Sequence, residues 1–248
     1  MAVVPFRNQT LLLRTMSLSN LEKVLKTARS DDWQLGRLSW VRYNHLLREI
    51  ARKHKTSLEI AAGVFSALSP NNDYLGNCRD TGTVLLNAAL GRSLEDFTVA
   101  TYGANKRKAW AIVRDGRPLD HLKFPKTRNF YLNLVNPLDP HPVTIDGHIY
   151  NAWMGRRLNL NSAATRFKPS MYEELANDVR ALANTYGEMA NVIQATIWHS
   201  WKRIHKIRFE EQMCLWGPDF LVAGLGFVNE LDIHHHALTI APQRRSHV

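Results

Sequence analysis

The residues best placed to do chemistry lie in one stretch, residues 143–150, where an acidic side chain ends a short β-branched run. Asp146 closes that run, and Ile149 and Trp153 then repeat at helical spacing, so we expect Asp146 at or next to a helix start. There the unpaired backbone N–H groups and the helix dipole favour an ionised carboxylate. Such a charge could act on a cationic reaction centre, or Asp146 could serve only as the N-cap of the helix. The stretch alone does not separate these two interpretations.

The composition suits a folded protein that binds a polyanion. The chain has 248 residues, 45% of them hydrophobic, with seven Trp and a formal net charge of +10. A basic balance of this size is typical of nucleic-acid-binding proteins, although a solvated basic surface with no partner gives the same count. We therefore expect a polyanionic partner, most often a nucleic acid. We also expect a monomeric protein.

The cysteine count and the hydropathy pattern indicate the cellular setting. Cys78 and Cys214 are too few for a disulfide framework or an all-cysteine iron–sulfur site, so we expect a reducing, cytoplasmic location. No apolar run is long enough to span a membrane, and the first residues do not form a signal peptide. The run 234–236 of three histidines lacks Cys or carboxylate partners at ligand spacing, so we expect neither a metal nor another cofactor.

Hydrophobic periodicity predicts a mainly helical protein with little strand. Thr56-Ser57-Leu58-Glu59 has the form of a capping box, and the helix that it opens ends before Pro70. Prolines at 137, 140 and 142 enforce an extended linker into the Asp146 stretch. The other predicted helices are two within residues 18–55, one over 74–90, a basic one after Tyr102, one over 128–135, one after Asp146, and two within 170–207.

Two helical segments carry side chains suited to nucleic acid. The basic helix after Tyr102 presents Lys106 and Lys108, which could bind phosphates together with the amides of the helix start. In the last helix Trp198 is either a core side chain or a platform on which a base stacks. His148 could orient Asp146, contact a phosphate, or be a buried structural histidine.

Four motifs follow one another along the chain. They are residues 65–71 (Phe-Ser-Ala-Leu-Ser-Pro-Asn), Lys106 with the pair Lys108-Ala109, the triplet Pro125-Lys126-Thr127, and residues 143–149 around Asp146. In this order and spacing they resemble the helix-hairpin-helix DNA glycosylases of the endonuclease III type. The resemblance covers about residues 57–157 and extends more loosely to residue 208.

The resemblance implies a fold, an activity and a set of site residues. The fold would be mainly α, with two helical lobes flanking a central DNA-binding cleft and a short irregular C-terminal extension. The partner would be double-stranded DNA. Asp146 would be the catalytic aspartate, Lys126 the nucleophile of the bifunctional members, and Asn71 would replace the glutamine that wedges into the duplex. Candidate DNA contacts are Asn71, Asn72, Lys106, Lys108, Thr127, Arg128 and His148, and candidates for the base pocket are Gln194 and Trp198. The implied parts are N-terminal helices (1–56), a lobe ending in the hairpin (57–136), a second lobe with Asp146 (137–208) and the extension (209–248).

The chain also departs from the family pattern. Residues 122–125 (Leu-Lys-Phe-Pro) replace the Gly-x-Gly hairpin whose glycines let the backbone approach a phosphate, and the four cysteines of the iron–sulfur loop are missing. The turns and the late Gln-Ala-x-x-Trp helix look more like divergent bacteriophage members, which would act in the host bacterial cytoplasm. Some relatives of that kind are thought to modify bases in viral DNA rather than excise them.

Together these observations predict an enzyme that flips a nucleotide and cleaves its N-glycosidic bond. Asp146 would stabilise positive charge on the sugar. Lys126 would either form a Schiff base and so add strand-cleaving (AP-lyase) activity, or contact a phosphate. Two other functions stay open: a transferase that modifies phage DNA bases with the same fold, and a DNA-binding protein that has lost its chemistry.

Overall fold

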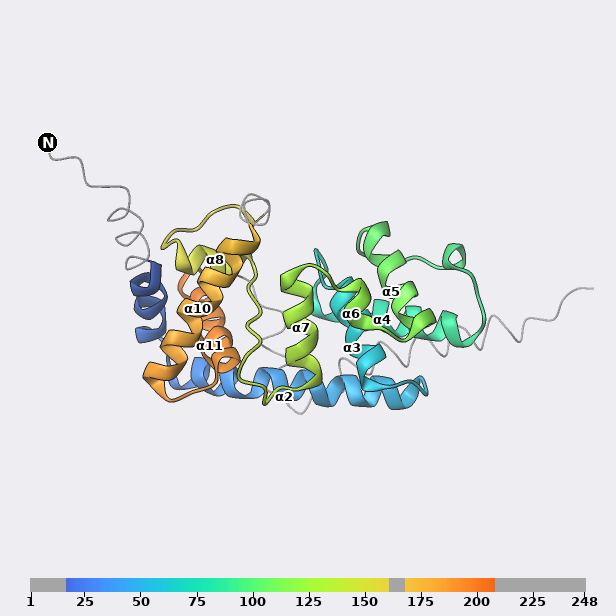
Figure 1. The fold of residues 1–248 in the computed structure, drawn as a ribbon, viewed down its shortest axis with the longest axis horizontal. Coiled ribbons are helices and arrows are strands. Elements are labelled where there is room, and N and C mark those ends of the chain that lie inside the picture. The colour runs from blue at the N-terminus through green and yellow to red at the C-terminus, as the bar shows by residue number, and fades with distance from the viewer. Residues whose placement is uncertain (1–16, 161–167, 208–248) are drawn as a thin grey trace, which may run out of the picture. The chain divides into compact units, whose positions relative to one another are not determined.

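The computed structural model of the chain describes residues 17–160 and 168–207. Within these ranges the protein is mainly helical and has no strand, which confirms the predicted mainly α class (Figure 1). The described residues form two compact units. Unit 1 contains residues 17–45, 122–160 and 168–207, and unit 2 contains residues 46–121. The predicted C-terminal extension, with its three histidines, lies outside the described residues.

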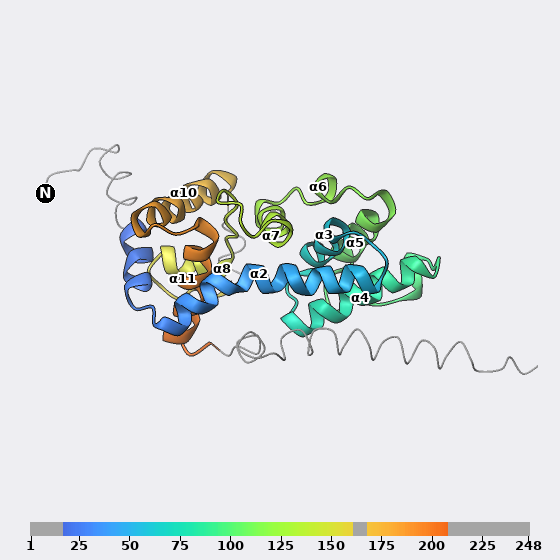
Figure 2. The same cartoon turned by 90° about the horizontal axis from the view of Figure 1, so that it is seen from below.

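Unit 1 packs helices around the segment that carries Asp146. Residues 17–26 are helical, and the named helices are the first part of α2 (Ser30–Lys53), α7 (Pro125–Val135), α8 (Gly147–Trp153), α10 (Pro169–Tyr186) and α11 (Ala190–Ile204). Helix α11 packs against both α8 and α10, as Figure 2 shows from below. Their shared core includes Ile145, Ile149, Leu175 and Ile193, all fully or almost fully buried. Each such side chain contributes about 1.5–3 kcal/mol of burial free energy, so this core fixes the stretch that leads into α8.

A buried ion pair joins the start of α2 to the end of α11. The Asp32 carboxylate is 1% exposed and accepts from Arg203 Nε (2.9 Å) and Nη2 (2.7 Å), and also from the backbone N–H of Arg29 (2.9 Å). Arg203 Nη2 donates in addition to the carbonyl of Thr27 (2.7 Å). The turn before α2 is thereby tied to the last turn of α11.

Unit 2 is a smaller helical body. Its elements are the end of α2, α3 (Leu58–Leu68), α4 (Tyr74–Ala89), the 3₁₀ turn η1 (Leu94–Asp96), α5 (Gly103–Asp115) and α6 (Pro118–His121). Helix α3 lies against α4, α5 and α6. The approach is close at Gly63, where an added Cβ would lie 2.8 Å from Pro118 Cβ. A side chain at position 63 would therefore push α6 away.

The helices follow the predicted order, with three differences in detail. Ser57, and not Thr56, is the N-cap of α3, because its side chain accepts from the N–H of Ile60 (3.2 Å). Helix α7 begins at Pro125 rather than at Arg128, since a proline is well suited to the first helical position. Between Gly116, whose φ of 70° ends α5, and α7 lies the short helix α6, which was not predicted.

The boundaries between the two units differ from the boundaries that the sequence predicted between parts of the chain. The unit boundaries fall at 45/46 and 121/122, whereas the sequence placed boundaries at 56/57 and 136/137. The reason is that α2 continues through the first boundary as one helix, without a break in its sequence pattern. A boundary inside a continuous helix leaves no Pro, Gly or polar linker for sequence analysis to detect.

Candidate active site

The Asp146 carboxylate caps α8, as the sequence predicted. The residue has extended backbone dihedrals (φ −108°, ψ −177°), and its Oδ1 accepts from the N–H groups of His148 and Ile149, both at 2.9 Å. These two bonds satisfy N–H groups that the helix itself cannot pair. They also hold the carboxylate in one orientation.

A second helix holds the other carboxylate oxygen. The indole N–H of Trp198, on α11, donates to Asp146 Oδ2 at 2.7 Å. The carboxylate therefore accepts from three N–H donors, yet the side chain stays half-buried and so remains within reach of solvent. An N-cap needs only the first two of these bonds. The third bond comes from a residue 52 positions away in the chain, and it is the feature that goes beyond helix capping.

One tyrosine positions the backbone before Asp146. The Tyr172 hydroxyl, on α10, accepts from the N–H of Ile145 (3.0 Å) and donates to the carbonyl of Val143 (2.7 Å). Burial raises the pKa of Tyr172 well above its usual range, so the hydroxyl keeps its proton. The extended segment 143–145 is thus fixed at two points just before it bends into α8.

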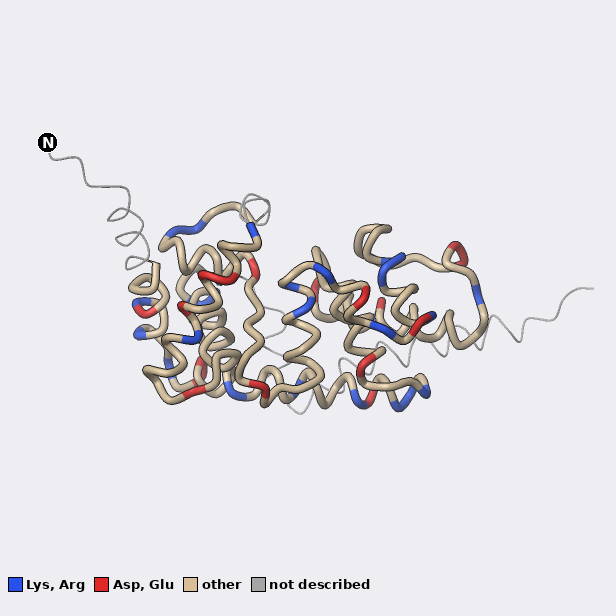
Figure 3. The backbone as a smooth tube through the Cα atoms, viewed as in Figure 1, with Lys and Arg blue, Asp and Glu red and all other residues tan. Residues whose placement is uncertain are grey.

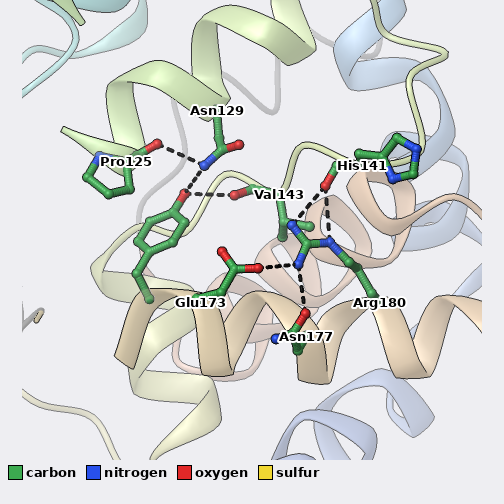
Figure 4. Close-up of polar contacts among 8 residues, drawn as sticks. Pro125, Asn129, His141, Val143, Glu173, Asn177 and Arg180 are labelled. Atoms are coloured by element: carbon green, nitrogen blue, oxygen red, sulfur yellow. Dashed lines mark hydrogen bonds and ion pairs between the residues drawn. The ribbon is translucent and has the colours of Figure 1, made fainter. Parts of the chain in front are cut away.

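The same hydroxyl connects this segment to α7. Asn129 Nδ2 donates to Tyr172 Oη (3.2 Å) and to the carbonyl of Pro125 (3.0 Å), and Figure 4 shows Asn129 between Pro125 and Val143. Lys126 follows Pro125 in the first turn of α7. One hydrogen-bonded chain therefore links the first turn of α7, where Lys126 lies, to the backbone that leads into Asp146.

An arginine anchors the start of the extended segment. Arg180 donates through Nε (3.1 Å) and Nη2 (3.0 Å) to the carbonyl of His141, and through Nη1 to Glu173 (2.8 Å) and Asn177 (2.9 Å) (Figure 4). A guanidinium held by two partners on its own helix is a rigid donor. The segment from residue 141 to Asp146 is therefore pinned at both ends.

His148 lies next to the carboxylate and is half-buried. Burial lowers its pKa from the ordinary value, and the charge of Asp146 opposes that shift. Three cations lower the pKa further: Lys202, Lys126 and Arg157. The imidazole meets the Trp198 ring edge to face, with the ring centres 6.2 Å apart. Its Nδ1 is buried and has no hydrogen-bond partner within residues 17–160 and 168–207.

The predicted base-pocket residues lie on one face of α11. Gln194 is 5% exposed and precedes Trp198 by one helical turn. Its Oε1 has no hydrogen-bond partner among the described residues. One turn earlier, Asn191 donates to the carbonyl of Pro137 (2.8 Å). This face of α11 is therefore polar although it is buried, and a buried acceptor of this kind has a high cost unless a partner satisfies it.

The remaining predicted residues of α7 differ in exposure. Thr127 is buried and its hydroxyl donates to the carbonyl of Phe124 (3.1 Å), whereas Arg128 is exposed. Figure 3 shows basic positions at the start of α7 and also in the segment that follows α8. Thr127 therefore has a structural contact, and Arg128 is available to a ligand.

The predicted residues of unit 2 gather where two loops meet. Asn71 has a left-handed backbone (φ 56°), is exposed, and donates to the hydroxyl of Tyr102. Asn72 donates to the carboxylate of Asp80 (2.8 Å), which also accepts from the N–H of Ala100 (2.8 Å). The buried Asp80 carboxylate therefore fixes both loops, and the left-handed backbone at Asn71 is held in place.

The two lysines of α5 differ in their contacts. Lys106 Nζ donates to the carbonyl of Phe97 and lies over that ring, 4.3 Å from its centre. Lys108 is half-buried. Unit 2 thus contains Asn71, Asn72, Lys106 and Lys108, while unit 1 contains Asp146, Lys126, His148, Gln194 and Trp198.

Sequence reasoning missed four residues of unit 1: Asn129, Arg157, Tyr172 and Lys202. None belongs to a local motif, and each reaches the site through contacts between distant segments. The spacing of Gln194, Trp198 and Lys202 at four-residue intervals was the one available signal, because it puts all three on one helix face.

The described residues contain neither a metal-binding cluster nor a membrane-spanning helix. In residues 17–160 and 168–207 there is no group of three or more His, Cys, Asp or Glu side chains that could hold a metal ion. Among the helices in those ranges, none is long and apolar enough to cross a membrane.

Comparison with known proteins gives one result. Residues 4–205 match the model of a family described as a family of unknown function (DUF7178). Neither a curated protein nor a solved structure matches the chain.

Proposed function

This chain belongs to the DUF7178 family, whose function is unknown, and we propose that it is a DNA glycosylase that flips a nucleotide and cleaves its N-glycosidic bond. The observation that supports this most is the Asp146 carboxylate. It is half-buried, it is oriented by three N–H donors, and three cations (Lys202, Lys126 and Arg157) act on the neighbouring His148. A helix cap alone requires neither the indole donor nor the cations.

The chemistry follows from the charge of the carboxylate. When the N-glycosidic bond breaks, its electron pair leaves with the base and positive charge develops on the sugar. A fixed anion close to that charge stabilises the transition state without having to reorganise. Water then adds to the sugar carbon and gives up a proton, and the base takes up a proton. The half-exposed position of Asp146 suits this role, because the reacting sugar must come to it.

Lys126 gives the proposed enzyme a second route. As a neutral amine it would bond to the sugar carbon in place of water, and the base would leave with the electron pair of the glycosidic bond. Ring opening would yield a Schiff base, which promotes elimination of the 3′ phosphate and breaks the strand. The link through Pro125, Asn129 and Tyr172 holds the first turn of α7 in register with the Asp146 segment.

Flipping the base requires further contacts. Extrusion of a nucleotide costs a few kcal/mol, which a side chain filling the gap offsets in part. Asn71 is our candidate for this wedge, since it is exposed and its left-handed backbone is held by the contacts of its loop. Gln194 and Trp198 are the candidates for base recognition, since the Gln194 oxygen is buried without a partner among the described residues.

The test is single-turnover release of free base from DNA carrying a range of damaged and modified bases. Wild-type protein should release at least one base without a second substrate. The Asp146→Asn protein should remain folded and bind DNA, but its release rate should fall by about 10²–10³, because one well-placed electrostatic group is worth about 3–4 kcal/mol. Asp139→Asn is the matched control, since Asp139 also accepts a backbone N–H, from His141 (3.0 Å).

Each other outcome has a distinct meaning. Near-wild-type release by a well-folded Asp146→Asn protein would defeat the proposal. Base modification only in the presence of a second substrate would indicate a transferase, and DNA binding without any base chemistry would indicate a binding protein. A protein–DNA adduct trapped by borohydride, and lost in Lys126→Gln, would assign the lyase step to Lys126.

A further inference from the structure

A row of side chains runs along the C-terminal half of α11, next to the proposed active site. Trp198 bonds to Asp146 and contacts His148, and the ammonium of Lys202 lies over the Trp198 ring, 4.2 Å from its centre. At the end of the row, Arg157 Nη1 donates to the carbonyl of His205 (3.4 Å). Arg157 comes from the segment after α8, so two separate parts of the chain supply the row.

This row carries an excess of positive charge. Three cations act on His148, from Lys202, Lys126 and Arg157, against the single carboxylate of Asp146. That carboxylate already accepts three hydrogen bonds from N–H groups. Like charges that act on one imidazole also repel one another. An arrangement of this kind suits a site in which an anion completes the balance of charge.

The general preference of cations for helix C-termini does not explain why Lys202 and Arg157 lie here. Cations are common at helix C-termini because they complement the helix dipole. However, the ammonium of Lys202 lies over a ring one turn earlier in the helix, and Arg157 does not belong to α11 at all. Lys202 contacts the Trp198 ring, and the charges of Lys202 and Arg157 both act on His148; these two rings are the neighbours of Asp146.

We propose that Lys202 and Arg157 form a phosphate subsite beside His148. The subsite holds one phosphodiester of the bound DNA next to the flipped nucleotide. The identity of this anion as a DNA phosphodiester rests on the proposed function. Arg157 and Lys202 are cations suited to a phosphate, and Arg is also able to bind it through two parallel N–H groups. A phosphate at this point fixes the register of the strand, so that the sugar of the neighbouring nucleotide lies at Asp146.

His148 serves as the reporter of this subsite. Two readouts are measured: the pKa of His148 by NMR, with His148→Gln to assign its signal, and the salt dependence of DNA affinity. The probes are inorganic phosphate and a short duplex with one tetrahydrofuran abasic site, which stands in for a nucleotide that has lost its base. Duplex binding should raise the His148 pKa, because the bound phosphate offsets the three cations.

The variants test whether Lys202 and Arg157 contact the same phosphate. Lys202→Gln and Arg157→Gln together should flatten the log–log salt slope by about 0.9, the value for a single phosphate on duplex DNA. Each single variant should flatten it less, because the remaining cation still neutralises the same phosphate. Arg156→Gln is the matched control: it removes the same charge from the neighbouring, exposed position and should leave the His148 response intact.

Several results would overturn the subsite. One is an unchanged His148 pKa on duplex binding, and another is no binding of the duplex at all. Equal flattening when Arg156→Gln or Arg157→Gln is added to Lys202→Gln would show a diffuse basic surface instead of a built site. A response to inorganic phosphate but not to the duplex would show that the anion is not a DNA phosphodiester. If Asp146→Asn and wild-type protein both release no base while the duplex response persists, the glycosylase proposal fails and the subsite stands.

Discussion

Two aspartates, one in each unit, hold loops in similar ways but differ in what surrounds them. Asp146 in unit 1 accepts from two backbone N–H groups and an indole, and Asp80 in unit 2 accepts from a backbone N–H and an amide side chain. Asp80 is 3% exposed, and its nearest cation is Arg79, at 3.8 Å. Asp146 is half-buried, and cations from three segments act on its neighbour His148.

The comparison shows that hydrogen bonding alone does not mark a functional carboxylate. Both carboxylates are satisfied, and both fix the backbone around them. What differs is access, since a ligand can reach Asp146, whereas Asp80 is enclosed by the loops that it joins. We therefore expect loss of Asp80 to affect stability and loss of Asp146 to affect activity, and the following predictions test that division.

The largest effect on stability should come from Asp80→Ala. It removes a buried charge and leaves the N–H of Ala100 and the amide of Asn72 without their acceptor. Unsatisfied buried donors of this kind cost about 3 kcal/mol in total. Urea denaturation would measure this loss, with Asp120→Ala as the control. Asp120 is exposed and pairs only on the surface with Arg117 (3.3 Å), a contact worth about 0.5 kcal/mol. Equal losses in the two variants would contradict a structural role for Asp80.

Tyr172→Phe should reduce both stability and activity, in contrast to Asp80→Ala. It keeps the ring but removes the hydroxyl that pairs Ile145, Val143 and Asn129. The expected loss is about 2 kcal/mol in the free energy of unfolding. Base release should also slow, because the Asp146 segment loses its anchor. Tyr186→Phe, on the more exposed end of the same helix, should change neither quantity. Unimpaired release by Tyr172→Phe would show that the segment needs no such anchor.

The bond between Asp146 and Trp198 should appear as a coupling between the two residues. Asp146→Asn can still accept from the two N–H groups of α8, but its amide nitrogen then faces the indole N–H, so two donors oppose each other. Trp198→Phe removes that donor. A double-mutant cycle in urea denaturation should give a coupling of about 1–2 kcal/mol. Independent, additive effects would mean that the Trp198 bond contributes nothing to holding the carboxylate.

The smallest effect concerns the cations of unit 2. Neutralising Lys106 and Lys108 together should flatten the log–log salt slope of DNA binding by about 2 if both contact phosphates. The single variants separate the two residues, since Lys106 already donates to Phe97 whereas Lys108 is only half-buried. A slope that stays the same in the double variant would show that α5 lies off the DNA, and that the cations of unit 1 are the ones that bind it.

The sequence by itself determined most of the helices and the local role of Asp146. Their order, their approximate ends and the N-cap at Asp146 follow from periodicity and from residues a few positions apart. Where two local signals competed, prediction was less accurate: Ser57 replaced Thr56 as the cap of α3, and α7 began at Pro125. Such signals act between neighbours along the chain, so the chain itself displays them.

Only the tertiary structure decided what surrounds Asp146. The indole of Trp198 reaches it from 52 residues away, and Tyr172 fixes Ile145 from 27 residues away. The cations of Lys202 and Arg157 reach His148 from two further segments. These contacts depend on how α8, α10 and α11 pack around their shared apolar core. Burial in that core is non-directional, so the sequence pattern shows that the helices pack but not which polar side chains then meet.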